Sequence, residues 1–165
     1  MNDSISSGDP LKAWQRGIAA IKELAAAAAA LRSDQATTLT LLKQALDSPT
    51  ERVSALLLLN NIHPDFTVLL ADRLVALSLS HRDALLVRQI LGRLSYEQAQ
   101  GVVPAAVWRQ LDSTDDYDAY RRLAELLAHL GLTQSLRQLC ERALASQDPD
   151  VREVGEDLAP TEHDQ

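Results

Sequence analysis

The sequence predicts an all-α fold, a right-handed α-solenoid of about four helix pairs preceded by an N-terminal capping helix. Three observations lead to this prediction. Of the 165 residues, 46% are hydrophobic but only 4% are aromatic, and Leu and Ala supply most of the apolar content. That composition favours helices over sheets, which draw on β-branched and aromatic residues. Apolar residues also recur at helical spacing, and a two-helix pattern repeats about every 30–36 residues.

The charge and hydropathy of the chain argue against two classes of partner. The formal net charge is −7, whereas a general nucleic-acid binder needs a positive surface field. The acidity is concentrated in residues 112–165, which carry thirteen acidic and five basic side chains. The most apolar runs, residues 24–31 and 55–59, are far shorter than the roughly 20 residues of a spanning helix. We therefore expect neither a nucleic acid nor a membrane as partner.

Cysteine usage and the two ends of the chain give further expectations. Cys140 is the only cysteine, which excludes an intrachain disulfide and favours a reducing compartment. The first ten residues are polar and acidic and lack the pattern of a signal peptide, so we expect a cytoplasmic location. Residues 1–9 and 160–165 are short polar ends that we expect to be disordered. Residues 10–159 then form a single domain.

The first helix is predicted to begin at Pro10, with Asp9 as its N-cap. Residues 25–30 are six consecutive alanines, which add high intrinsic helix propensity. We expect this helix to pack as a cap on the stack rather than to bind a partner. An apolar stripe at helical spacing supports that expectation; its members are Trp14, Ile18, Ile21, Leu24 and Leu31.

Short breaks rich in Pro, Gly, Asp and Ser separate the remaining helices. The second helix is expected over Thr37–Leu46. The third ends at Asn61, and Ser48 and Glu51 form a capping-box pattern at its start. Gly131 stands where a helix C-cap is expected. Because the connections are short, consecutive helices should be antiparallel. Further helices are expected over residues 65–78, 82–94, 96–111, 116–130, 132–146 and 149–158.

The internal repeat is the strongest signal in the sequence. The second helices of successive pairs end near Ile62, Leu94 and Leu130, which lie 32 and 36 residues apart. The break inside each pair also recurs, since residues 46–53 are similar in kind to residues 144–152. One helix pair cannot bury its apolar face alone, and stacked pairs share a continuous core. The repeat therefore predicts the α-solenoid.

At the level of motifs, the chain resembles the HEAT-repeat families, especially the short HEAT-like repeats of bacteria. The segment Asp148-Pro149-Asp150-Val151-Arg152-Glu153 is very similar to the turn between the two helices of that repeat. The TPR family ranks second, because its Trp-Leu-Gly-Tyr and Ala-Phe-Pro positions are not evident. The resemblance implies a curved stack whose second helices line the concave face, in a scaffold or adaptor. It also implies that Arg52 and Arg152 bond to an aspartate of an adjacent unit.

Residue types that carry catalysis or bind metals form no recognisable motif. The histidines, at positions 63, 81, 129 and 163, are not spaced as a ligand set, and a zinc site needs three or four convergent ligands. Cys140 falls on the apolar face of its helix and is expected to be a buried hydrophobe. Isolated glycines do not make a phosphate-binding loop. We expect no catalytic residue, no metal and no cofactor.

The acidic turn over residues 112–118 has two interpretations. We favour N-capping of the following helix by Asp or Thr, since negative charge suits a helix N-terminus. The alternative is an acidic partner-docking loop that carries Tyr117 and Tyr120. An EF-hand is excluded, because the Gly and the bidentate Glu of that loop are missing at their offsets.

Polar side chains on the second helices form the predicted binding site, because arginine is favoured at interface hot spots. The predicted partner-binding residues are Arg88, Gln89, Arg93, Arg121, Arg122, Glu125 and His129. We expect a non-catalytic protein–protein interaction module, an adaptor, scaffold or assembly chaperone, whose partner is another protein. Two alternatives stay open: an immunity-type inhibitor that neutralises a partner enzyme, and a HEAT-like chromophore lyase subunit of the phycobilin-lyase type.

Overall fold

A computed structural model describes residues 9–114 and 116–159, and all regular secondary structure in these residues is α-helical. The predicted all-α class is therefore confirmed. The expectation of disorder at the two ends concerns residues that, apart from Asp9, lie outside the described ones. The helices are α1 (Pro10–Ser33), α2 (Gln35–Asp47), α3 (Arg52–Leu59), α4 (Pro64–Leu69), α5 (Ala71–Ser78), α6 (Ala84–Leu91), α7 (Tyr96–Leu111), α8 (Tyr117–His129), α9 (Thr133–Leu144) and α10 (Pro149–Leu158).

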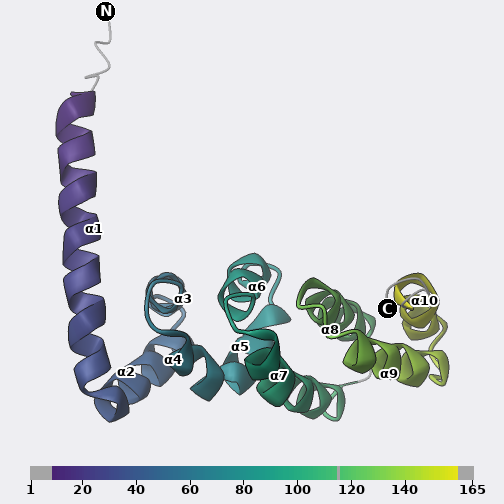
Figure 1. The fold of residues 1–165 in the computed structure, drawn as a ribbon. Helices are drawn as coiled ribbons and strands as arrows, with labels where there is room; N and C mark the ends of the chain where they lie inside the picture. Colours follow the sequence, from purple (N-terminus) through teal and green to yellow (C-terminus); the bar gives the residue numbers. More distant parts are fainter. Residues whose placement is uncertain (1–8, 115, 160–165) are drawn as a thin grey trace, which may run out of the picture.

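After α1, the helices form two rows (Figure 1). One row contains α2, α4, α5, α7 and α9, and the other contains α3, α6, α8 and α10. Each helix of the second row packs on the helix before it in the first, as α3 does on α2 and α10 on α9. Neighbouring pairs also touch, through α3 and α6, α5 and α7, and α8 and α10. Within the described residues, the pairing agrees with the four helix pairs that the repeat predicts.

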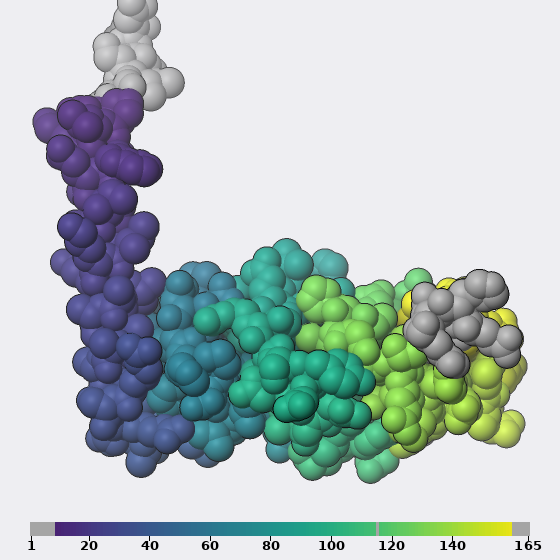
Figure 2. All heavy atoms as spheres, in the orientation of Figure 1, coloured from purple at the N-terminus to yellow at the C-terminus, as the bar shows by residue number. Residues whose placement is uncertain are grey.

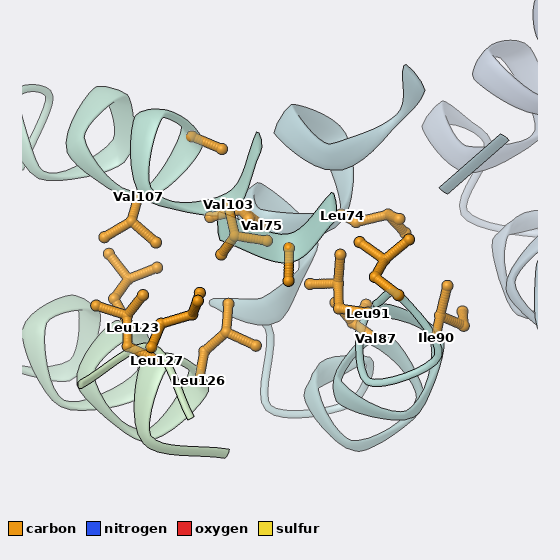
Figure 3. Packing of buried hydrophobic residues seen from close by; sticks show 14 of the residues in the cluster. Leu74, Val75, Val87, Ile90, Leu91, Val103, Val107, Leu123, Leu126 and Leu127 are labelled. Carbon is orange, nitrogen blue, oxygen red and sulfur yellow. The ribbon is translucent and has the colours of Figure 1, made fainter. Parts of the chain in front are cut away.

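The hydrophobic core lies between the two rows. Figure 3 shows its central part, in which side chains of α5, α6, α7 and α8 meet. All ten residues labelled there, Leu74 and Leu127 among them, have no exposed surface. Burial of the apolar stripes of these four helices holds neighbouring pairs together.

Two helix ends are capped by the residues that the sequence predicts, Asp9 and Gly131. Asp9 caps α1, because its carboxylate accepts a hydrogen bond from the Leu11 N–H at 3.0 Å. Gly131 closes α8 in the left-handed conformation, with φ of 66°. The Leu132 N–H then donates to the Leu127 carbonyl at 3.0 Å, which completes the usual glycine-dependent C-terminal motif.

The start of the third helix differs from the prediction. α3 begins at Arg52, and the residues before it form a turn. The Ser48 hydroxyl lies 3.1 Å from the Thr50 hydroxyl instead of capping a helix. The Ser48 backbone carbonyl accepts the Arg52 N–H at 2.9 Å. The predicted capping box is therefore wrong, because a neighbouring hydroxyl occupies the side chain that would have formed it.

The helix predicted over residues 65–78 is two helices, α4 and α5, joined at Leu70. The backbone of Leu70 has φ of −110° and ψ of 8°, outside the helical range. Its side chain is buried in the core, and its N–H still donates to the carbonyls of Phe66 and Thr67. The bend lets α4 contact α3 while α5 contacts α6 and α8, so tertiary packing overrides the continuous helical pattern.

The N-terminal helix does not cap the stack, contrary to the prediction. α1 projects away from the two rows, and its C-terminal end alone contacts α2 (Figures 1 and 2). Asp34 is both the last cap of α1 and the N-cap of α2, where it accepts from the Thr37 N–H at 3.1 Å. Because one residue links the two helices, α1 and α2 meet at an angle. Two antiparallel helices that pack side by side need a connecting loop of about 2–5 residues.

Candidate functional site

A polar groove lies between α6 and α8, on the row that contains the second helix of each pair. Its volume is about 380 Å³. All of the lining side chains except His81, which lies in the turn before α6, project from α6 or α8. The lining residues are His81, Ala84, Leu85, Arg88, Asp118, Arg121, Arg122 and Glu125. Four of the seven predicted binding residues are among them, so the structure brings part of the predicted set together.

Glu125 joins the two walls of the groove. The Arg88 guanidinium of α6 donates to the Glu125 carboxylate through Nη2–Oε2 at 2.5 Å. The Arg121 Nε lies 3.7 Å from the other carboxylate oxygen. The Arg88 Nε is buried and has no hydrogen-bond partner within the described residues. An unsatisfied buried donor is uncommon in proteins, and here it belongs to a side chain that lines the groove.

Arg121 contacts three side chains, of which Glu125 was described above. It donates to the Tyr117 hydroxyl at 3.0 Å and to the Asp157 carboxylate at 3.4 Å. The hydrogen bond to Tyr117, followed by the attraction of Asp157, raises the pKa of the Arg121 guanidinium. An arginine is charged at physiological pH whatever its surroundings, so the effect of these contacts is to orient the guanidinium, with α10 contributing through Asp157.

Arg93 and Arg122 are bonded to helix ends rather than left available for a partner. Arg93 donates to the carbonyls of Leu59, at 3.2 Å, and Ile62, at 3.3 Å, at the C-terminus of α3. Arg122 lines the groove but donates to the Leu79 carbonyl at the end of α5. Carbonyl groups at a helix C-terminus lack intrahelical partners and attract cations. Both arginines therefore link consecutive helix pairs.

The remaining two predicted residues lie outside the groove. Gln89 is exposed on α6, and His129 is exposed at the end of α8. The His129 ring stands beside Gly92, where a Cβ on the glycine would lie 3.4 Å from its Nε2. The binding set that the structure places in one groove is therefore Arg88, Arg121 and Glu125, with Arg122 in a bonded role.

Sequence reasoning missed four groove residues, His81, Ala84, Leu85 and Asp118, of which Leu85 is the most exposed hydrophobic. Its side chain is 70% exposed at the rim, more than any other large hydrophobic of the described residues. The apolar run at the start of α6 hides this exception, because Val87 and Ile90 in the same run are fully buried. The exposed leucine therefore adds an apolar contact to a groove that is otherwise lined mainly by charged side chains.

The acidic turn before α8 acts mainly as a cap. Asp116 accepts a hydrogen bond from the Ala119 N–H at 3.1 Å, which confirms the favoured interpretation. Asp112 pairs with Arg142 at 3.0 Å, and Tyr120 is buried and accepts from the same arginine. Asp115 lies outside the described residues. Tyr120 is therefore part of the packing between α8 and α9 rather than of a docking loop.

One of the two predicted arginine–aspartate links is present. Arg52 lies 3.5 Å from the buried carboxylate of Asp83, in the next helix pair. Arg152 instead donates to the carbonyls of Ser146 and Gln147, both at 3.0 Å, in the turn of its own pair. α10 is the last helix described, so no following pair stands beside Arg152.

Groups of metal-ligating type do not converge. Across residues 9–114 and 116–159, no three His, Cys, Asp or Glu side chains lie in a metal-binding arrangement. His63 caps α4, as its Nδ1 accepts from the Asp65 N–H at 3.4 Å, and His81 is exposed. His163 lies outside the described residues. The same part of the chain has no helix with the length and apolar character that a membrane crossing requires.

Cys140 is expected to resist thiol reagents until the protein unfolds. Its side chain is 2% exposed, and burial, aided by the nearby Glu141, raises the pKa of the thiol. Because the thiolate is the reactive form, both effects slow alkylation. Titration with a chromogenic disulfide should give no rapid reaction in buffer and one thiol per chain in denaturant. Rapid stoichiometric reaction in buffer would contradict the packing of α9 described here.

Comparison of the chain with protein-family models, curated proteins and solved structures finds no match. The functional argument therefore rests on this chain's own residues and their arrangement.

Proposed function

We propose that the chain is a right-handed α-solenoid of four HEAT-like helix pairs that binds a partner protein, without catalysis, through the groove between α6 and α8. The observation that carries the proposal is the groove itself, which combines an exposed leucine with three arginines and two carboxylates. Arginine is enriched at the centre of interfaces, where the buried area is more apolar than at the polar rim.

Orientation of the charged groups supports this proposal. Arg88, Arg121 and Glu125 hold one another in place before any partner arrives, so little side-chain freedom is lost on binding. The Arg88 side chain is part of the groove wall, so its guanidinium is the group of this arginine that faces a partner. A helix or loop that presents an apolar side chain to Leu85 and an acceptor to Arg88 fits this chemistry.

A pair of matched leucine variants tests the proposal. Leu85→Glu places a charge at the groove rim, and Leu69→Glu places the same charge at the end of α4, where the leucine is 51% exposed. Full-length wild-type and variant chains are immobilised, incubated with extract of the source cells, and the captured proteins quantified by mass spectrometry. We expect Leu85→Glu to reduce recovery of the partner at least tenfold and Leu69→Glu to leave it unchanged.

Thermal unfolding followed by circular dichroism checks that both leucine variants fold as the wild type does. Equal recovery of every captured protein by Leu85→Glu and wild type would refute the groove as the binding site. Turnover of a small compound by the purified chain alone would refute the non-catalytic part of the proposal.

A further inference from the structure

α1 exposes a continuous apolar stripe that its own chain does not cover. The stripe consists of Leu11, Trp14, Ile18 and Ile21, which are 62%, 68%, 36% and 64% exposed. Their separations of three, four and three residues place them on one face of the helix and match the a and d positions of a coiled coil. Scattered exposed leucines are ordinary on a protein surface, but a contiguous row of this kind marks an interaction site.

The stripe leads into an apolar groove at the base of α1. This groove has a volume of about 340 Å³, and its walls come from α1, α2 and α3. Leu41, on its wall, is 53% exposed. Leu31 belongs to α1 and also lines the groove, so the groove begins at the end of the helix that carries the stripe. Its apolar walls are Leu31, Leu41, Leu42, Ala45, Ala55 and Leu58.

The two halves of α1 complement each other in size. The N-terminal half carries the large side chains of the stripe, whereas residues 25–30 are all alanine. Two antiparallel copies place large side chains against small ones, which lets layers interdigitate. With Ile18 opposite Ile21 of the second copy, Trp14 meets Ala25, and Leu11 lies level with Ala28, one turn before the groove residue Leu31. A parallel pair would set Trp14 against Trp14 and leave the alanines facing one another.

Charge favours the same antiparallel arrangement. Lys12, Arg16 and Lys22 all lie in the N-terminal two thirds of α1, and Arg32 lies at its end. Parallel helices would bring these like charges together along the whole length, whereas antiparallel helices separate Lys12 from its counterpart. The arrangement also places Lys12 of one copy towards the groove of the other, where Glu51 is the one charged lining residue.

The stripe supplies a large part of the area that a dimer needs. The four stripe residues of each copy leave roughly 450 Å² of apolar surface to cover, on the scale of about 150–250 Å² for a large aromatic side chain. Two copies therefore supply about 900 Å² before the groove walls and backbone are counted, close to the roughly 1,200–2,000 Å² of a specific interface. The exposed length of α1 needs a partner of its own length, and a second copy provides one.

We propose that α1 is a dimerisation arm, which pairs in antiparallel fashion with α1 of a second copy and seats its N-terminal end at the groove of that copy. The arrangement has two-fold symmetry, so each chain gives an arm and receives one. It leaves the groove between α6 and α8 of both copies open.

Sedimentation equilibrium of the full chain over a hundredfold range of concentration tests the dimer. Ile21→Glu buries two carboxylates near the symmetry axis, and we expect it to weaken dimerisation at least 100-fold. Ala19→Glu places the same charge on the opposite face of α1, and we expect a dimer as stable as that of the wild type. Both positions are exposed, so the variants fold, which circular dichroism verifies. A wild-type chain that stays monomeric up to 100 μM, on the order of a weak contact, overturns the proposal.

Disulfide trapping distinguishes the orientation of the two arms. The double variant Trp14→Cys/Ala25→Cys should form a covalent dimer under mild oxidation, because the antiparallel register places these positions opposite each other. Neither single variant should do so, and buried Cys140 should leave the wild type uncross-linked. Efficient cross-linking of Trp14→Cys alone would show a parallel pair and overturn the register. Co-sedimentation of the wild type, but not Ile21→Glu, with anionic vesicles and no dimer in solution would assign the arm to lipid instead.

Discussion

Replacement of Gly155 by alanine lowers the free energy of unfolding by about 2 kcal/mol, an overpacking effect that exceeds the gain in helix propensity. A Cβ at this position of α10 would lie 2.8 Å from the Cys140 carbonyl oxygen and 2.8 Å from the Leu144 Cγ. Real Cβ atoms do not approach backbone this closely, so α9 and α10 must move apart. Urea denaturation followed by circular dichroism measures the difference. Gly155→Val should cost more than alanine does.

Gly101 provides the matched control for Gly155. It lies inside α7, and a Cβ there would have no atom within 4 Å. Gly101→Ala should therefore stabilise the protein by about 0.5–1 kcal/mol, since alanine favours the helix and nothing opposes it. The same substitution thus has opposite signs at the two sites. Equal effects at both would show that helix propensity alone governs Gly155, and the close contact between α9 and α10 would be wrong.

Replacement of Arg52 by methionine lowers the free energy of unfolding by about 3 kcal/mol, the scale expected when one partner of a buried ion pair is removed. The Asp83 side chain is 2% exposed, and Arg52 is its partner from the neighbouring helix pair at 3.5 Å. Arg82 lies 3.6 Å away but is largely exposed, so it compensates weakly. Arg52 also donates from Nε to the Leu46 carbonyl at 2.8 Å, which methionine cannot do.

A second substitution separates these contributions. Adding Asp83→Asn to Arg52→Met removes the buried charge, so it should restore part of the lost stability. Arg109→Met is the control, because Arg109 and Asp72 form an exposed pair on the first row of helices and such pairs contribute about 0–1 kcal/mol. Denaturant titration of the four proteins gives the comparison. If Arg109→Met costs as much as Arg52→Met, burial of Asp83 does not explain the effect.

Helix positions were predictable because their determinants are local. The bounds 96–111 and 149–158 agree with α7 and α10 to the residue, since Ser95, Pro149 and the adjacent polar residues mark helix ends in the sequence itself. Gly131 was predictable for the same reason, because a left-handed C-cap favours glycine whatever the surroundings. The division at Leu70 was not, since the segment carries no proline or glycine there.

The roles of the individual arginines could be assigned only from the tertiary structure. Arg88, Arg93, Arg121 and Arg122 are equivalent in the sequence, as charged positions on second helices. In the fold, Arg93 and Arg122 lie next to the open carbonyls of α3 and α5, whereas Arg88 and Arg121 meet across Glu125. A side chain's partner at a separation of more than 30 residues depends on how the helix pairs stack, which no local pattern specifies.

The sequence by itself determined the helical class, most helix bounds, the pairing of helices along the chain and the burial of Cys140. Only the tertiary structure decided that α1 stands apart, that Leu85 faces solvent, and which arginines are bound to helix ends. The physical reason is the distance along the chain over which each interaction acts. Capping, helix propensity and apolar periodicity act within about one or two turns, while the direction in which α1 leaves Asp34 and the neighbours of Leu85 depend on packing between segments distant in the chain.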